Sequence, residues 1–286
     1  MADGKDNDTE GGWSWRVASP QENTDLGLLY EPGNWGDILK GTWAGLIASR
    51  LPAGKDSGPL ACLDPWCGAP EYPLLEGPAR RLEWLGSCGF IDLQRDWLEQ
   101  AKVASTGLLV RQALLSRGLE VRLEVFDSDP GRLEKWAAVE GTEALAISSG
   151  EQALQGTDAD LVLVDPYDYL AGWEKTLPLI AGLADSAVVL VYIYNRSPRG
   201  GEHTRRYKRF RQELDKLDCS YLSGRIGSDI LLPRAFHEML LLGPASFLSS
   251  VENDLGKATR QLACKMSTAG CFEKGGTGSP GDQPGE

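Results

Sequence analysis

Short apolar runs alternate with amphipathic stretches along most of this chain, and that alternation constrains the fold more than any other feature. The clearest example is residues 160–165, an almost continuous apolar run between two aspartates. Such a run is typical of a central strand that is buried on both faces. Strands that alternate with helices indicate βαβ units. The sequence therefore predicts an α/β fold, with a mostly parallel central sheet and helices on both faces.

The two ends of the chain differ in composition from its middle. Residues 1–20 are polar and predict a flexible N-terminal tail, and residues 273–286 have no apolar face and predict a disordered C-terminal tail. Residues 21–272 are predicted to form a single domain. Within it, residues 74–105 interrupt the alternation after the first strand and predict a helical insertion, interpreted as a lid.

Charge and cysteine spacing exclude several classes of protein. The 29 Lys and Arg against 41 Asp and Glu give a net charge of −12, which argues against nucleic-acid binding by bulk charge alone. The six cysteines lack the spacing of a zinc site, and only two histidines accompany them, so no metal is expected. No apolar run approaches the roughly 20 residues that span a bilayer. We expect a cytoplasmic protein with no membrane partner.

Ligands of parallel sheets bind at the carboxyl ends of the strands. The turn after the first strand carries Asp64 and, four residues later, Gly68, and the next strand ends at Asp127. This first turn lacks the glycine pattern of a dinucleotide site, and the chain lacks a P-loop. The pattern is typical of an S-adenosylmethionine site, in which Gly68 admits the methionine moiety and Asp127 accepts the ribose hydroxyls. Helix capping is the alternative role for both aspartates.

A second motif follows the apolar run at 160–165. Asp165-Pro166-Tyr167-Asp168-Tyr169 resembles the [DNS]-P-P-[YFW] box of amino-group methyltransferases. In such a box a carboxylate and a proline carbonyl accept the hydrogens of an adenine amine, and an aromatic ring stacks on the base. Asp165, Pro166 and Tyr169 are therefore the predicted catalytic residues. An ordinary Asp-Pro turn is the alternative.

Four segments, in order, resemble one family. Residues 32–40 (PGNWGDILK) are similar to its A-G-N-x-A-D-V-L-K segment, and residues 62–72, 105–111 and 163–166 to three later segments. Over about residues 28–245 the chain resembles a divergent member of the RlmJ-type bacterial large-subunit (23S) ribosomal RNA adenine-N6 methyltransferases. The resemblance implies a Rossmann-like class I methyltransferase fold, S-adenosylmethionine as cofactor and Lys40 facing the cofactor carboxylate. The implied cofactor-binding residues are Asn34, Lys40, Asp64, Gly68, Thr106, Asp127, Ser149 and Gly150.

The chain departs from the family pattern at several of these points. Pro70 replaces a glycine of the first turn, Ser149 replaces an acidic residue, and Tyr167 and Asp168 replace the second proline and the aromatic. The leading hypothesis is N6-methylation of adenine in RNA. Two alternatives remain open: methyl transfer to a small molecule or a protein, and a non-catalytic binding protein on a degenerate methyltransferase fold.

A basic cluster at residues 196–211 indicates an anionic partner despite the acidic composition. We interpret it as an RNA-binding segment, and a solvated helix face is the alternative. The candidate substrate-binding residues are Arg196, Arg199, Arg205, Arg206 and Arg209.

Overall fold

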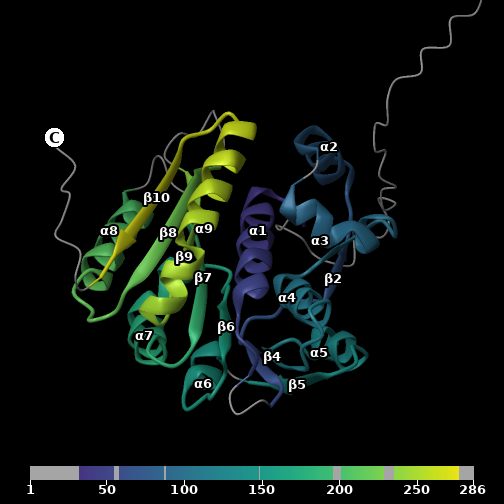
Figure 1. Cartoon of the computed structure of the whole chain (residues 1–286), viewed down its shortest axis with the longest axis horizontal. Coiled ribbons are helices and arrows are strands. Elements are labelled where there is room, and N and C mark those ends of the chain that lie inside the picture. The colour runs from purple at the N-terminus through teal and green to yellow at the C-terminus, as the bar shows by residue number, and fades with distance from the viewer. Residues whose placement is uncertain are drawn as a thin grey trace, which may run out of the picture.

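The computed structural model describes residues 32–54, 58–86, 88–147, 149–195, 201–228 and 235–276. The predicted tail at 1–20, together with Arg196 and Arg199, lies outside these ranges. Helices and strands alternate through most of the described chain (Figure 1). In order they are α1 (Trp35–Arg50), β1 (Leu60–Asp64), β2 (Glu71–Pro73), α2 (Glu76–Leu85), α3 (Gly89–Leu98), β3 (Lys102–Ala104), α4 (Thr106–Leu115), β4 (Val121–Asp127), α5 (Pro130–Ala137), β5 (Thr142–Ala146), α6 (Gly150–Leu154), β6 (Leu161–Val164), α7 (Tyr169–Leu183), β7 (Val188–Asn195), α8 (Glu202–Leu214), β8 (Tyr221–Gly227), β9 (Phe236–Leu242), α9 (Ala245–Lys265) and β10 (Gly270–Gly275).

Eight of the described strands form one sheet in the order β10-β8-β9-β7-β6-β1-β4-β5. The five strands from β7 to β5 run parallel, and β9 lies antiparallel between β7 and β8. Because these five strands run in the same direction, their carboxyl ends all lie on the same side of the sheet. The strand β1 is at the centre of this set, so the turns that follow β1, β4 and β6 are neighbours.

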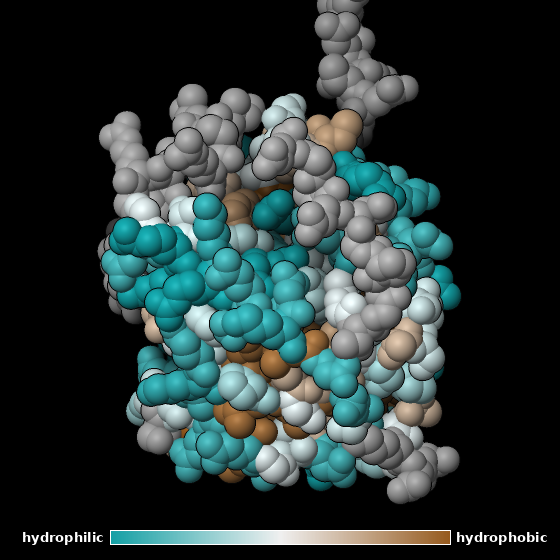
Figure 2. Space-filling model, turned by 90° about the vertical axis from the view of Figure 1, so that its left-hand side faces the viewer, coloured by the Kyte–Doolittle hydropathy of each residue, from teal (hydrophilic) through white to brown (hydrophobic). Residues whose placement is uncertain are grey.

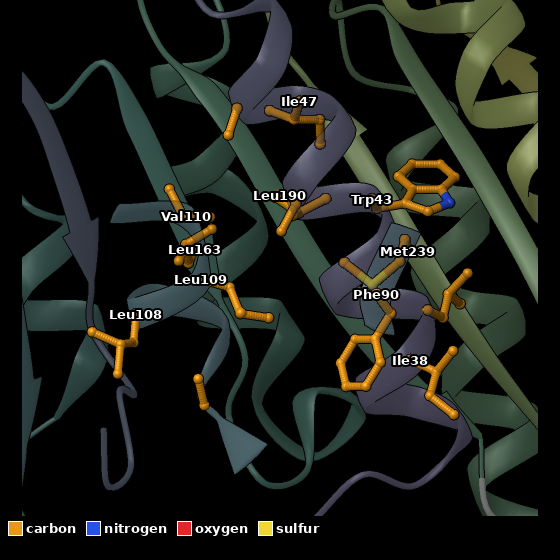
Figure 3. Close-up of a cluster of buried hydrophobic side chains, with 14 of the residues drawn as sticks. Ile38, Trp43, Ile47, Phe90, Leu108, Leu109, Val110, Leu163, Leu190 and Met239 are labelled. Carbon is orange, nitrogen blue, oxygen red and sulfur yellow. The ribbon is translucent and has the colours of Figure 1, made fainter. Parts of the chain in front are cut away.

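Each face of the sheet has its own hydrophobic core. Successive residues of β6 point to opposite faces: Leu161 and Leu163 belong to one core, and Val162 and Val164 to the other. The first core packs against α1, α4 and α9, and the second against α7 and α8. Figure 3 shows the first core, where α1 contributes Ile38, Trp43 and Ile47 beside sheet residues such as Leu190 and Met239. Burial on both faces explains why β6 reads as a continuous apolar run.

The predicted insertion contains α2 and α3, with the short strands β2 and β3 paired antiparallel on either side. The two-stranded ribbon joins the ends of the insertion at its base. In Figure 1, α2 and α3 stand beside the amino-terminal part of α1, away from β8 and β10.

The disordered C-terminal tail was predicted to start at residue 273, but regular structure continues to residue 275. Residues 273–275 belong to β10, where Glu273 pairs with Ser223 and Gly275 with Tyr221 of β8. Main-chain hydrogen bonds to the edge of β8 need no apolar side chains, so the polar composition of this segment was misleading. Phe272 of the same strand packs against Trp43.

Figure 2 shows that the side of the molecule carrying α8 and β10 is mainly hydrophilic, with an apolar area below.

Candidate active site

A cleft of about 840 Å³ lies at the carboxyl ends of the parallel strands. It brings together residues that sequence analysis predicted from widely separated segments. Its walls include the predicted cofactor-binding residues Asn34, Lys40, Asp64, Gly68, Thr106, Asp127, Ser149 and Gly150, and also Asp165 and Pro166. The volume is in the range of small-molecule sites.

The turn after β1 lines the cleft and is held by hydrogen bonds at Gly68. Gly68 has a φ of +61°, and a Cβ there would lie 2.4 Å from the Tyr72 hydroxyl. Its N–H donates to Asp127 Oδ2 at 3.2 Å, and its carbonyl accepts from the Trp136 indole at 2.9 Å. Glycine is therefore required for conformation and for space. Asp127 thus stabilises the turn as well as lining the cleft.

Asp64 is a buried carboxyl group at the floor of the cleft, with 4% of the residue exposed. It lies against the first turn of α4, because a Cβ on Gly107 would be 2.8 Å from its Oδ2. Desolvation, followed by the charge of Asp165, raises the pKa of Asp64 to about 7. A carboxyl group that is so costly to ionise would be stabilised by a cation bound in the cleft.

Lys40 connects α1 to the end of β6. Its Nζ lies 2.6 Å from Asp165 Oδ2 and 2.9 Å from Asp37 Oδ1, and the lysine side chain is only 8% exposed. Asn34 positions this helix, since its side chain accepts hydrogen bonds from the N–H groups of Gly36 and Asp37. Desolvation raises the pKa of Asp165, and Lys40 opposes that rise. The arrangement therefore holds Asp165 beside a cation at the centre of the cleft.

The side of the cleft beyond Asp165 is built by β7 and β9. The Tyr192 hydroxyl lies 2.7 Å from His237 Nδ1, and the Tyr194 ring stacks on the imidazole at 4.7 Å. Burial lowers the pKa of His237 to about 4, so the ring is neutral near pH 7. Lys40 Nζ lies 4.7 Å from the centre of the Tyr192 ring, within the range of a cation–π contact. This wall is aromatic and uncharged.

The aromatic wall was not predicted from the sequence as part of the site. The signal that could have found it is the two-residue spacing of Tyr192 and Tyr194 in an apolar run, which places both on one face of a strand. His237 gave no signal, because only the antiparallel pairing of β9 with β7 places it opposite Tyr194.

Tyr169 does not lie where the methyltransferase box suggested. It is the first residue of α7, is 3% exposed, and packs edge-on against Phe210 at 5.5 Å. The helix starts immediately after the motif and turns this side chain into the second core. The aromatic residue of this segment that lines the cleft is Tyr167.

The described part of the basic cluster lies on α8, outside the cleft lining. Arg206 pairs with Glu202, and Arg209 pairs with Glu174 at 3.0 Å. Arg205 is exposed. The cluster is therefore partly neutralised by neighbouring acids, and the cleft is not continuous with these three arginines.

One solved structure overlaps with nearly the whole described fold. Protein LPL1258 from Legionella pneumophila str. Philadelphia 1, assigned to family DUF519, matches with a TM-score of 0.62 at 15% identity, covering 86% of this chain and 98% of its own. This likeness shows a shared fold. No family model and no curated protein matches the sequence.

The fold is the predicted Rossmann-like class. Two looser overlaps are with a plantazolicin methyltransferase, BpumL, solved with S-adenosylhomocysteine (TM-score 0.39, 10% identity, 78% of this chain and 89% of that one), and with an rRNA methylase from Streptococcus thermophilus (0.36, 13%, 70% and 94%). Both TM-scores are too low to support an argument about function. No helix among the described residues is long and apolar enough to cross a membrane.

Proposed function

We propose that this protein is an S-adenosylmethionine-dependent methyltransferase that methylates an exocyclic amine, with adenine N6 in RNA as the acceptor. The observation that carries the proposal is the convergence of Asp64, Gly68, Asp127 and Asp165 on one cleft, at the carboxyl ends of adjacent strands. These residues came from two sequence motifs at three strand ends, and each motif had an ordinary structural alternative. The cleft of about 840 Å³ beside these neighbouring strand ends favours a ligand site over three turns and caps.

The charges that line the cleft fit this cofactor. The described lining includes the carboxyl groups of Asp37, Asp64, Asp127 and Asp165 against the cations Lys40, Arg81 and Arg132, an excess of one negative charge if all ionise. S-adenosylmethionine carries a sulfonium and an ammonium against one carboxylate, an excess of one positive charge. The buried Asp64 is the group that gains most from a nearby cation.

Within this proposal each wall of the cleft has a role. Gly68 has no side chain and so leaves space for the methionine moiety, and Asp127 accepts hydrogen bonds from the ribose. When bound, S-adenosylmethionine supplies an electrophilic methyl group on its sulfonium sulfur. The other three residues act on the acceptor. The Asp165 carboxylate and the Pro166 carbonyl accept hydrogen bonds from the two amine hydrogens, and the single proton that the methylated nitrogen loses passes to the Asp165 carboxylate. Lys40 orients Asp165 and favours its ionised form.

The neutral aromatic wall supports a flat acceptor. The rings of Tyr192 and Tyr194 both contact the neutral His237 imidazole, so the wall holds flat side chains in place and His237 adds no charge that would need a counterion. A flipped nucleobase is read by stacking and by hydrogen bonds to its amine edge. In this proposal the aromatic wall takes the place of the aromatic residue that the motif lacks.

Methyl transfer to a small molecule is the second candidate. It is favoured by the ion pairs of Arg206 and Arg209, which weaken the basic cluster as a surface for phosphates. The two candidates share the cofactor half of the cleft and differ only in the acceptor.

Calorimetric titration with S-adenosylmethionine and S-adenosylhomocysteine tests the cofactor site directly. We expect binding by the wild type and loss of binding in Asp127→Ala. Asp129→Ala is the matched control, because Asp129 caps α5 nearby and lies outside the cleft lining. If neither ligand binds the wild-type protein, the proposed function is wrong and a non-catalytic role remains.

A further inference from the structure

Two aromatic side chains are exposed at the rim of the cleft. Among the described residues, the large apolar side chains that remain exposed are Trp84, Leu115, Leu145 and Tyr167, at 59%, 37%, 39% and 68%. The two aromatics are the most exposed of the four. Tyr167 lines the cleft at the end of β6, and Trp84 packs edge-on against Trp35, which also lines it, with ring centroids 6.1 Å apart. Exposed aromatic rings beside a cleft provide faces on which a base can stack.

The helix α2 holds Trp84 in this position. Its buried residues Leu82 and Leu85 fix one face against the first core, so Trp84 projects from the opposite face. The Arg81 guanidinium lies 5.1 Å from the Trp35 ring and donates to the Gly33 carbonyl at 3.0 Å. Arg81 and Trp84 therefore support the Trp35 ring from the same helix. The platform, defined here as Trp35, Arg81 and Trp84, is continuous with the cleft.

The charge distribution favours contact through rings over contact through phosphates. The protein carries −12 overall, and the described arginines of α8 lie outside the cleft lining. Binding that depends on phosphate neutralisation would be weak on such a surface. Aromatic platforms, by contrast, bind any base because every base has a π-face.

We propose that Trp84 and Tyr167 stack on the nucleotides that flank the acceptor base in a single-stranded nucleic acid. This inference rests on the proposed function and deepens it, because it identifies where the strand contacts the protein. Tyr167 borders the cleft after the end of β6, and the platform borders it from α1 and α2. An acceptor small enough to lie wholly inside the cleft would leave Trp84 without a role.

The test measures binding of a fluorescein-labelled, ten-nucleotide adenine-containing RNA by anisotropy, in saturating S-adenosylhomocysteine. The variants are Trp84→Ala and Tyr167→Ala, and Leu145→Ala is the control, since it removes an exposed apolar side chain outside the cleft. Each aromatic variant should bind RNA about 5- to 150-fold more weakly. Leu145→Ala should match the wild type. Calorimetry measures the affinity of all four proteins for S-adenosylhomocysteine, and RNA binding is compared at ligand saturation, so that a change in cofactor affinity does not account for a loss of RNA binding.

A salt series provides an independent readout. Stacking predicts that the logarithm of the affinity falls only slightly with the logarithm of salt concentration, whereas each neutralised phosphate adds about 0.7 to that slope on single strands. A slope above about 3 would overturn the proposal in favour of a basic surface.

The outcomes separate the two proposals. If the proteins bind S-adenosylhomocysteine but RNA binding is absent, or is unchanged in both aromatic variants, the inference is wrong while the cofactor site stands. Absence of S-adenosylhomocysteine binding in the wild type contradicts the proposed function itself.

Discussion

The half of the cleft at the ends of β1, β4 and β5 is built from backbone turns, whereas the half at the ends of β6, β7 and β9 is built from side chains. In the first half, Gly68 and Asp127 hydrogen-bond to each other across neighbouring strands. In the second half, Lys40, Tyr192 and His237 come from three distant elements and contact one another through their side chains. Under the proposed function, the first half holds the cofactor through the Gly68 turn and the carboxyl groups of Asp64 and Asp127, and the second half contacts the acceptor.

The largest effect is expected in the second half, from Asp165→Asn. The amide keeps the shape of the side chain but loses the charge that accepts the amine proton and pairs with Lys40. Methyl transfer to RNA should fall about 10²- to 10⁴-fold, while S-adenosylhomocysteine binding changes little. Asp168→Asn, three residues away and outside the cleft lining, should retain transfer. Full activity of Asp165→Asn would remove the mechanistic distinction between the halves.

In the first half, Gly68→Ala should reduce both stability and ligand binding. A residue with φ near +60° costs roughly 1–2 kcal/mol when it carries a Cβ, and here the Cβ would also approach the Tyr72 hydroxyl. Gly118→Ala is the matched control, because Gly118 has a φ of +74° and no atoms within 4 Å of the added Cβ. Thermal unfolding should shift in both variants, but only Gly68→Ala should weaken S-adenosylhomocysteine in calorimetry. Equal ligand affinity of the two variants would argue against backbone contact at this turn.

The pH dependence of ligand binding should report Asp64. Its pKa is raised to about 7, so between pH 8 and pH 6 the ionised fraction falls about tenfold. Affinity for S-adenosylmethionine should fall by a similar factor over that range, and Asp64→Asn should bind weakly with a flat profile. A wild-type profile that is flat from pH 6 to 8 would mean that Asp64 does not contact the positive charge.

The raised pKa of Asp64 also affects the free energy of unfolding. As the pH rises, the affinity for S-adenosylmethionine should increase, whereas the free energy of unfolding should decrease. Because the folded state holds the Asp64 proton more tightly than the unfolded state, the carboxyl lowers the free energy of unfolding progressively from about pH 4 to pH 7. Asp64→Asn should therefore be more stable than the wild type at pH 8, by an amount on the order of a few kcal/mol. Urea unfolding at pH 5 and pH 8 measures the difference, which should be smaller at pH 5.

The smallest effect on ligand binding is expected from substitutions on α8, which lies outside both halves of the cleft. The triple variant Arg205→Ala, Arg206→Ala and Arg209→Ala removes exposed or paired side chains from α8. Ion pairs of this exposure contribute at most about 1 kcal/mol each to stability. Because none of the three arginines lines the cleft, the affinity for S-adenosylhomocysteine and for RNA should stay close to that of the wild type. A large loss of RNA affinity in this variant would restore the basic cluster as the acceptor surface.

The parts of the fold that follow from local pattern were predictable. The apolar run at 160–165 is the buried strand β6, and the interruption at 74–105 contains the helices α2 and α3. Asp64, Gly68, Asp127 and Asp165 were also predictable as a group, because each follows a strand and parallel strands end at one edge.

The sequence by itself determined the alternation of strands and helices and the turns that end the parallel strands, since both depend on residues adjacent in the chain. Only the tertiary structure decided which side chains complete the site. The start of α7 buries Tyr169, the pairing of β9 with β7 places His237 beside Tyr192, and the pairing of β10 with β8 orders residues 273–275. These outcomes depend on contacts between segments far apart in sequence, which local hydrophobic periodicity does not encode.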